Sequence, residues 1–152
     1  MWIGYPNWQA YLGIYSLLVF MNQENKIDIE QVHNYCLENF PILMKEYGYG
    51  KENFQEDNVF YSFDRFAEFL IEEGFIKNDN LLIDKVKAYI LTLLECGEDK
   101  VRNAVYVSFI EGLVDKGYKY PHLKGFITDM PEDVKTFIKS FFIDEVLVSL
   151  DV

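Results

Sequence analysis

The chain has little of what metal sites and disulfide frameworks require. It contains 2 cysteines, Cys36 and Cys96, and 2 histidines, His33 and His122. The cysteines lie far apart without a CxxC spacing, so we expect small buried apolar residues in a reducing compartment rather than a disulfide framework. Glu30 and His33 form one ExxH pair, whereas a carboxylate di-iron site needs two such pairs, so we reject that site.

Motifs of catalysis and nucleotide binding are also missing. The sequence contains no GxSxG, GxGxxG or P-loop pattern, and neither histidine stands in a recognisable nucleophilic arrangement. Its 14 basic residues are outnumbered by 25 acidic ones and do not cluster, which disfavours binding to DNA or RNA. We therefore expect no enzyme activity, no cofactor and no nucleic-acid partner.

The surplus of negative charge is concentrated in one part of the chain. The net charge is −11, and residues 1–23 carry no charged side chain. Residues 24–80 contain 13 acidic and 5 basic residues, whereas residues 81–120 contain 6 of each. An acidic region attracts basic proteins by long-range electrostatics. The expected partner is therefore a basic protein.

Length and composition predict one domain over residues 1–152. Half of the 152 residues are apolar, and 13 Phe, 11 Tyr and 2 Trp can fill a sizeable core. The uncharged segment 1–23 is expected to be an N-terminal helix added to that core. Its apolar run, Tyr11–Met21, is shorter than the about 20 residues of a membrane span, and no basic residue precedes it as in a signal peptide. We expect a cytoplasmic protein, with membrane association as the alternative.

Helical spacing of apolar residues dominates the sequence. It predicts an all-α, single-domain bundle of about six helices, with stacked HEAT-like helix pairs as the alternative. The expected helices lie at residues 8–21, 29–40, 42–47, 59–73, 82–96, 98–113 and 131–142. Residues 117–125 are expected to form a loop, and the tail, residues 144–152, is compatible with a helix or a short strand.

Four residues are expected to mark helix ends. Asp28 and Asn80 are predicted caps, because short polar side chains satisfy the free N–H groups of a first turn. Gly74 and Gly97 are predicted to end the helices that precede them.

The helix expected at residues 59–73 combines an apolar stripe with an acidic face. Asp64, Glu68 and Glu72 follow at i, i+4 and i+8, and like charges at that spacing cost a few tenths of a kcal/mol per pair. Three interpretations stay open: a solvated face, a docking face for a basic partner, and a metal or catalytic carboxylate cluster, which lacks a histidine. The predicted apolar stripe consists of Phe60, Phe63, Phe66, Phe69 and Leu70.

The predicted docking surface continues on both sides of this helix. Tyrosine among acidic residues suits an interface that must hold a partner as well as attract it. The alternative is an acidic loop that keeps the protein soluble. The predicted partner-binding residues are Glu52, Glu56, Asp57, Tyr61, Asp64, Glu68, Glu72, Glu73 and Asp79.

Two segments resemble a known family. NVFYSFDRFAEFLIEEG (residues 58–74) and LLECGEDKVRNAVYVSFIEGL (residues 93–113) are similar to small acidic all-α bacterial proteins of mostly unknown function. Asn39, Phe40 and Pro41 fit an early turn of the same family. Several members resemble immunity proteins of polymorphic toxin systems. The resemblance implies a fold more than a function, because the matching positions are mainly packing positions, and it supplies no catalytic residue.

The resemblance and the charge together lead to one expected function. The chain is expected to be a non-enzymatic immunity protein that neutralises a cognate toxin by occluding it with an acidic, aromatic-containing surface. A helical bundle that binds a small apolar ligand or a membrane surface is the alternative, based on the aromatic content and the uncharged first helix. A third possibility is an inhibitor that imitates a phosphate backbone with its carboxylates. The sequence predicts no oligomeric state.

Overall fold

The computed structural model describes residues 26–48 and 58–152, which are mainly helical. Their one extended contact is an isolated parallel bridge between Ile27 and Gly97. There the Ile27 N–H donates to the Cys96 carbonyl at 2.8 Å, and the Glu98 N–H donates to the Ile27 carbonyl at 2.9 Å. The all-α fold class is therefore confirmed, while the helix expected at residues 8–21 lies outside the described residues.

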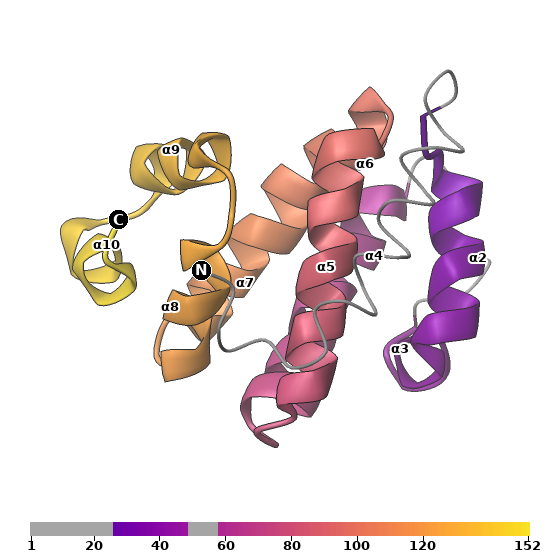
Figure 1. Ribbon diagram of the computed structural model, residues 1–152, viewed down its shortest axis with the longest axis horizontal. Helices are drawn as coiled ribbons and strands as arrows, with labels where there is room; N and C mark the ends of the chain where they lie inside the picture. Colours follow the sequence, from indigo (N-terminus) through magenta and orange to yellow (C-terminus); the bar gives the residue numbers. More distant parts are fainter. Residues whose placement is uncertain (1–25, 49–57) are drawn as a thin grey trace, which may run out of the picture.

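The described helices pack side by side around a central α5 (Figure 1). Figure 1 places α2 and α3 at one end of the molecule and α9 and α10 at the other. Because α4 continues into η3, and α6 into η4 and α7, the described part holds eight continuous helices, slightly more than predicted. The bounds are α2 Ile29–Asn39, α3 Pro41–Glu46, α4 Val59–Phe69, η3 Leu70–Phe75, α5 Asn80–Cys96, α6 Asp99–Ala104, η4 Val105–Ile110, α7 Glu111–Gly117, α8 Pro121–Thr128, α9 Glu132–Phe141 and α10 Asp144–Leu150.

Aromatic side chains fill the core, and Phe66 lies at its centre. Its ring centroid is 5.3 Å from that of Phe109 in an edge-on arrangement and 5.4 Å from that of Phe40. These contacts join α4 to η4 and to the end of α2. The phenylalanines with almost no exposed surface are Phe40, Phe63, Phe66, Phe75, Phe109 and Phe126.

Phe60 does not belong to this core, although the sequence placed it in the apolar stripe. It is 42% exposed, whereas Phe63 and Phe66 are fully buried. Three residues turn an α-helix by about 300°, which is less than a full turn. Side chains spaced by three therefore shift around the helix axis, and Phe60, the first of the series, lies outside the buried face. Two further apolar residues of the described helices, Leu37 and Val107, are 55% and 43% exposed.

The predicted ends of α2 and α5 are partly confirmed. Asp28 caps α2, because its carboxylate accepts the Gln31 N–H at 2.8 Å. Gly97 ends α5, where a Cβ would lie 2.4 Å from the Leu93 carbonyl oxygen. The predicted cap Asn80 is wrong: Asp79, one residue earlier, accepts the backbone N–H of the third residue of α5 at 3.0 Å.

The end predicted at Gly74 is also wrong. The helix continues as η3 to Phe75, a segment of wider π-helical pitch. Gly74 instead allows close packing on α5, because a Cβ there would lie 3.1 Å from Cγ1 of Ile83. Asn78, with a φ of 53°, makes the turn that follows.

The C-terminal third contains more helix than predicted. The loop expected at residues 117–125 is wrong, because α8 begins at Pro121, whose fixed φ and missing N–H suit a first helical turn. The tail forms helix α10, which buries Val146 and Leu150 at a spacing of four. Within the described ranges, no helix has both the length and the apolar character needed to cross a bilayer.

Candidate partner-binding groove

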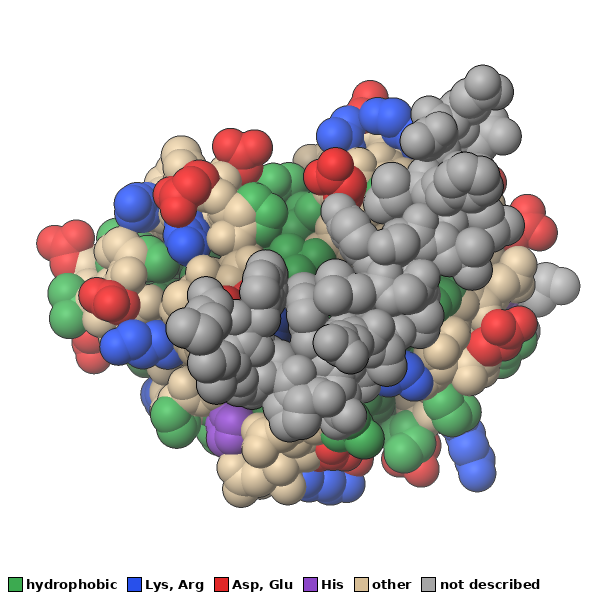
Figure 2. All heavy atoms as spheres, in the orientation of Figure 1, with side chains coloured by type: hydrophobic (Ala, Val, Ile, Leu, Met, Phe, Trp, Pro, Cys, Tyr) green, Lys and Arg blue, Asp and Glu red, His purple; other side chains and the backbone are tan. Residues whose placement is uncertain are grey.

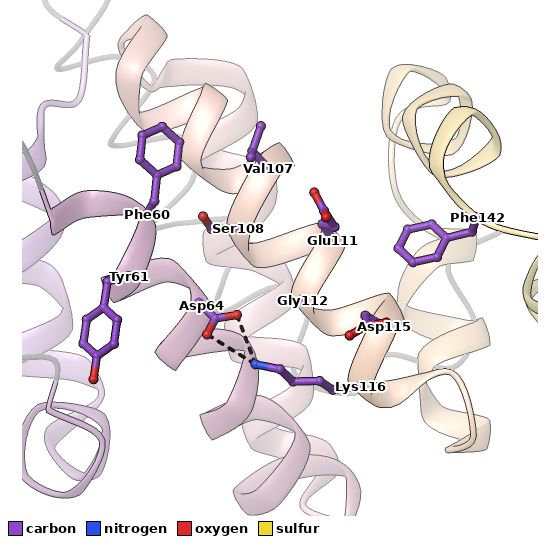
Figure 3. A pocket seen from close by; sticks show the side chains of 10 residues that line it. All are labelled: Phe60, Tyr61, Asp64, Val107, Ser108, Glu111, Gly112, Asp115, Lys116 and Phe142. Carbon is purple, nitrogen blue, oxygen red and sulfur yellow. Dashed lines mark hydrogen bonds and ion pairs between the residues drawn. The ribbon is translucent and has the colours of Figure 1, made fainter.

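An open groove of about 410 Å³ lies between α4 and the η4–α7 segment (Figure 3). Helix α4 forms one side, and η4 and α7 form the floor. Phe142, the residue that follows α9, lies on the far side. The lining residues are Phe60, Tyr61, Asp64, Val107, Ser108, Glu111, Gly112, Asp115, Lys116 and Phe142.

The floor of the groove depends on a close approach between α4 and α7. A Cβ on Gly112 would lie 2.9 Å from Oδ1 of Asp64, so the absence of a side chain lets this carboxylate rest over α7. Phe66 of α4 and Phe109 of η4 also pack edge to face in the core, with their centroids 5.3 Å apart. The two elements that form the groove are therefore also joined by buried aromatic packing.

One lysine neutralises part of the acidic face predicted on α4. Lys116 Nζ lies 3.1 Å from Oδ1 of Asp64 and 3.1 Å from Oε1 of Glu68, and Arg65 also pairs with Glu68. Burial disfavours the charged form of Lys116, but hydrogen bonds to these carboxylates outweigh burial and raise its pKa. Asp64 and Glu68 therefore do not form a patch of unbalanced negative charge.

Unbalanced negative charge lies instead on α7. Glu111 and Asp115 stand one helical turn apart and line the groove (Figure 3). Among the described residues, neither carboxylate has a hydrogen-bond or ion-pair partner. Glu111 is half-buried and Asp115 is exposed. These two groups give the groove a net negative charge after Lys116 and Asp64 have paired.

Exposed apolar side chains accompany these carboxylates. Phe60, Tyr61 and Val107 are 42%, 48% and 43% exposed. Tyr61 is held in place by Arg65, whose guanidinium carbon lies 5.2 Å from the centroid of the tyrosine ring and whose Nε donates to the tyrosine oxygen at 3.0 Å. The groove thus offers aromatic surface and negative charge together.

The predicted partner-binding residues are only partly brought together. Tyr61 and Asp64 line the groove, and Glu68 joins it through Lys116. Three further predicted residues, Glu52, Glu56 and Asp57, lie outside the described residues.

Glu72 and Glu73 form a separate cluster with Tyr47. The Tyr47 hydroxyl donates to Oε2 of Glu72 at 2.6 Å and contacts Oε1 of Glu73 at 3.3 Å. Burial, reinforced by the hydrogen bond to Glu72, raises the pKa of Tyr47 well above its usual range. Glu73 also pairs with Lys77, while Asp79 caps α5. These three predicted residues therefore have local structural partners.

Sequence reasoning missed Glu111 and Asp115, because they lie in residues 81–120, where acidic and basic residues are equal in number. One signal was available. The lining residues of η4 and α7 are three pairs of neighbours, and each pair follows the previous one by four residues. Residues four apart lie on the same face of a helix, so this spacing indicates a shared surface. These lining residues are Val107, Ser108, Glu111, Gly112, Asp115 and Lys116.

A second charged site lies inside the molecule, between α5 and the end of α8. Lys87 is 4% exposed, and its Nζ lies 2.7 Å from Oδ2 of Asp129. Burial raises the pKa of the neighbouring Asp84. In the described part of the chain, no group of three His, Cys, Asp or Glu side chains could hold a metal ion.

Comparison with known proteins gives one match. A family model described as "Domain of unknown function (DUF7674)" matches residues 33–144, which include α4, α5 and the groove-forming segments of α6, η4 and α7. No curated protein and no solved structure matches the chain.

Proposed function

The chain belongs to the DUF7674 family of domains of unknown function, and we propose that it is a non-enzymatic domain that binds a basic protein through the groove between α4 and α7. The observation that carries this proposal is the pairing of exposed aromatic rings with the carboxylates of Glu111 and Asp115 in one open groove. Negative charge accelerates encounter with a basic partner, and desolvated aromatic contacts slow its release.

The biological role that we propose is that of a cytoplasmic immunity protein. The similarity of residues 58–74 and 93–113 to proteins that resemble toxin-neutralising partners supports this role, as does the net charge of −11. Toxins that attack nucleic acids are typically basic. An acidic protein seated over such a toxin's active site blocks access of the substrate without any chemistry of its own.

Binding to the product of the neighbouring gene tests this proposal. The full chain and that product are mixed, and calorimetry measures their dissociation constant at two salt concentrations. We expect tight binding that weakens as salt screens the charges, together with protection of cells that express both proteins. A neighbouring product that is toxic in the same cells but neither binds the chain nor loses toxicity contradicts the proposal.

A second candidate function, attachment to a membrane surface, is favoured by one observation. Phe141, Ile143 and Val148 of the C-terminal helices are 60%, 68% and 79% exposed. Figure 2 shows apolar side chains at this end of the molecule among interspersed acidic and basic ones. Co-sedimentation with phosphatidylcholine vesicles tests the candidate, and a chain that stays in the supernatant rules it out.

A further inference from the structure

The groove offers a cationic side chain two kinds of contact at once. Phe60 stands on one side and Phe142 on the other, while Glu111 and Asp115 rise from the floor between them (Figure 3). The volume, about 410 Å³, lies near the lower end of the about 300–1,000 Å³ that small-molecule sites span. Such a groove holds one long side chain with its adjoining backbone, rather than a whole helix of a partner.

We infer that this groove binds an arginine side chain presented by the basic partner, an inference that rests on the proposed function. Glu111 and Asp115 face the groove without partners among the described residues, and Ser108 lines the same groove about one helical turn before Glu111. A guanidinium has five N–H donors in a fixed plane, so it can bind two acceptors while its face covers an aromatic ring.

Arginine fits better than lysine for two physical reasons. The lysine ammonium is compact and strongly hydrated, so removing its water to reach an aromatic wall is costly. The guanidinium is more weakly hydrated and stacks on rings. The chain itself contains this arrangement at the edge of the groove, where Arg65 covers the ring of Tyr61 at 5.2 Å and pairs with Glu68.

Lys116 determines where in the groove a cationic side chain of the partner can bind. Lys116 occupies the end of the groove beside Asp64, at 3.1 Å. A second cation is repelled from that end by like charge, whereas the carboxylate of Glu111, five residues before Lys116 along the chain, attracts it. The bound arginine is therefore expected near Glu111 and Ser108, rather than beside Asp64.

A titration followed by nuclear magnetic resonance tests the inference. The full chain, labelled with ¹⁵N, is titrated at constant ionic strength with capped pentapeptides whose central residue is arginine, lysine or uncharged citrulline, flanked by glycines. We expect the arginine peptide to shift the amide signals of Ser108, Glu111 and Asp115. We expect it to bind at least about threefold more tightly than the lysine peptide. Citrulline is expected to cause no comparable shift.

Two matched double variants distinguish the effect of the groove carboxylates on binding from the effect of the net charge. Glu111→Gln with Asp115→Asn is expected to weaken binding of the arginine peptide about tenfold, because two charged acceptors are lost. Glu30→Gln with Glu38→Gln removes the same charge from the exposed surface of α2 and is expected to change binding less than about twofold. Equal effects of the two double variants, equal binding of citrulline and arginine, or equal binding of lysine and arginine overturn the inference.

The inference and the proposed function fail in different ways. If the chain binds its basic partner and Glu111→Gln with Asp115→Asn leaves that binding unchanged, the arginine site is wrong and the proposed function stands. If the arginine peptide occupies the groove but the neighbouring gene product does not bind, the arginine site stands and the proposed function is wrong.

Discussion

Lys116 Nζ lies 3.1 Å from Oδ1 of Asp64, so a cation of α7 is paired with a carboxylate of α4 across one end of the groove. The same nitrogen lies 3.1 Å from Glu68, which makes it a bridge between two acidic residues that stand one turn apart. Without this bridge, the like charges of Asp64 and Glu68 would repel each other. The bridge also sets how much negative charge the groove shows to a partner.

Replacing Lys116 by methionine keeps the apolar stem and removes the charge. We expect a basic partner to associate about two- to fivefold faster at low salt, because Asp64 and Glu68 then add to the negative potential of the groove. The cost to folding stability is expected to stay below about 1 kcal/mol, since the ion pair is partly exposed. Stopped-flow association at two ionic strengths measures the effect.

Lys45→Met is the control, because Lys45 is exposed on α3 and does not line the groove. It changes the net charge by the same amount. Equal acceleration by both variants would show that net charge alone matters. Reversing Asp64, Glu68 and Glu72 to lysine is a poorer test, since that change breaks the bridge and the contact with Tyr47 as well as altering the charge.

Glu68 belongs to the same bridge, and its protonation is expected to change the stability of the fold at low pH. Burial disfavours its ionised form, but hydrogen bonds from Lys116 and Arg65 outweigh burial and lower its pKa. A carboxyl group with a lowered pKa stabilises the fold above its unfolded pKa of about 4.3, and that contribution is lost as the pH falls through the folded value. We expect Glu68→Gln to cost about 0.5–1 kcal/mol at neutral pH and nothing once the wild-type group is protonated.

Urea denaturation of the wild type and Glu68→Gln between pH 7 and pH 2.5 measures this difference. In Lys116→Met the carboxyl carbon of Glu68 should titrate at a higher pH than in the wild type, which side-chain magnetic resonance detects. A cost of Glu68→Gln that is the same at both ends of the pH range would mean that packing, not charge, is responsible.

Phe66 and Phe60 lie on the same helix but should differ in their effect on stability. Phe66 is fully buried and packs on Phe40 and Phe109, so Phe66→Ala is expected to cost about 3–5 kcal/mol through the cavity it leaves. Phe60 is 42% exposed, so Phe60→Ala should cost less than about 1 kcal/mol and weaken partner binding instead. Urea denaturation compares the two, and similar losses would contradict this assignment of Phe60 to the groove.

Much of the helical pattern could be predicted because it depends on local spacing. Phe63, Phe66 and Phe69 point into the core as their spacing indicated, and Asp28 caps α2 through a contact three residues away. Phe60 belongs to the same sequence pattern but is exposed. A spacing of three implies that the run drifts out of the buried face, but which of its members is exposed depends on the helices that cover α4, and local periodicity does not contain that information.

The groove could be predicted less well than the helices, because it is formed by residues that are far apart in the sequence. Lys116 and Asp64 are 52 residues apart in the sequence, so nothing near Asp64 indicates that its charge is paired. Glu111 and Asp115 lie in a segment of zero net charge, and their exposure to the groove follows from how α7 crosses α4. Acidic composition therefore led to the expectation of a basic partner, but it did not indicate which carboxylates line the groove.

Asp79 was expected to bind a partner, but its carboxylate accepts the Leu82 N–H at 3.0 Å at the start of α5. We expect Asp79→Ala to cost about 1 kcal/mol of stability, since a free N–H of the first turn loses its acceptor, and to leave partner binding unchanged. Asn80→Ala, one residue later, is the control and should change stability by less than about 0.5 kcal/mol. Thermal unfolding and calorimetric binding separate the two roles, and a loss of affinity in Asp79→Ala at full stability would restore Asp79 to the interface.

Gly112 and Gly125 provide a matched pair of helical glycines. Alanine is about 0.8–1 kcal/mol more favourable than glycine inside a helix. Around Gly125 a Cβ would meet nothing within 4 Å, so Gly125→Ala should stabilise the fold by about that amount. At Gly112 the new Cβ would lie 2.9 Å from Oδ1 of Asp64, so this carboxylate must move away from Lys116. We expect Gly112→Ala to gain little or no stability.

The second half of this test uses the Asp64→Ala background. With the carboxylate removed, a Cβ at position 112 has Ala67 Cβ at 3.7 Å as its remaining close neighbour, which is an ordinary contact distance. Gly112→Ala should then recover a gain similar to that of Gly125→Ala, as measured by urea denaturation. If the gain is still missing, backbone packing between α4 and α7 is what requires glycine at position 112. If the gain appears, α7 requires a glycine at position 112 because the Asp64 carboxylate needs the space beside it. This carboxylate forms the charged end of the groove with Lys116.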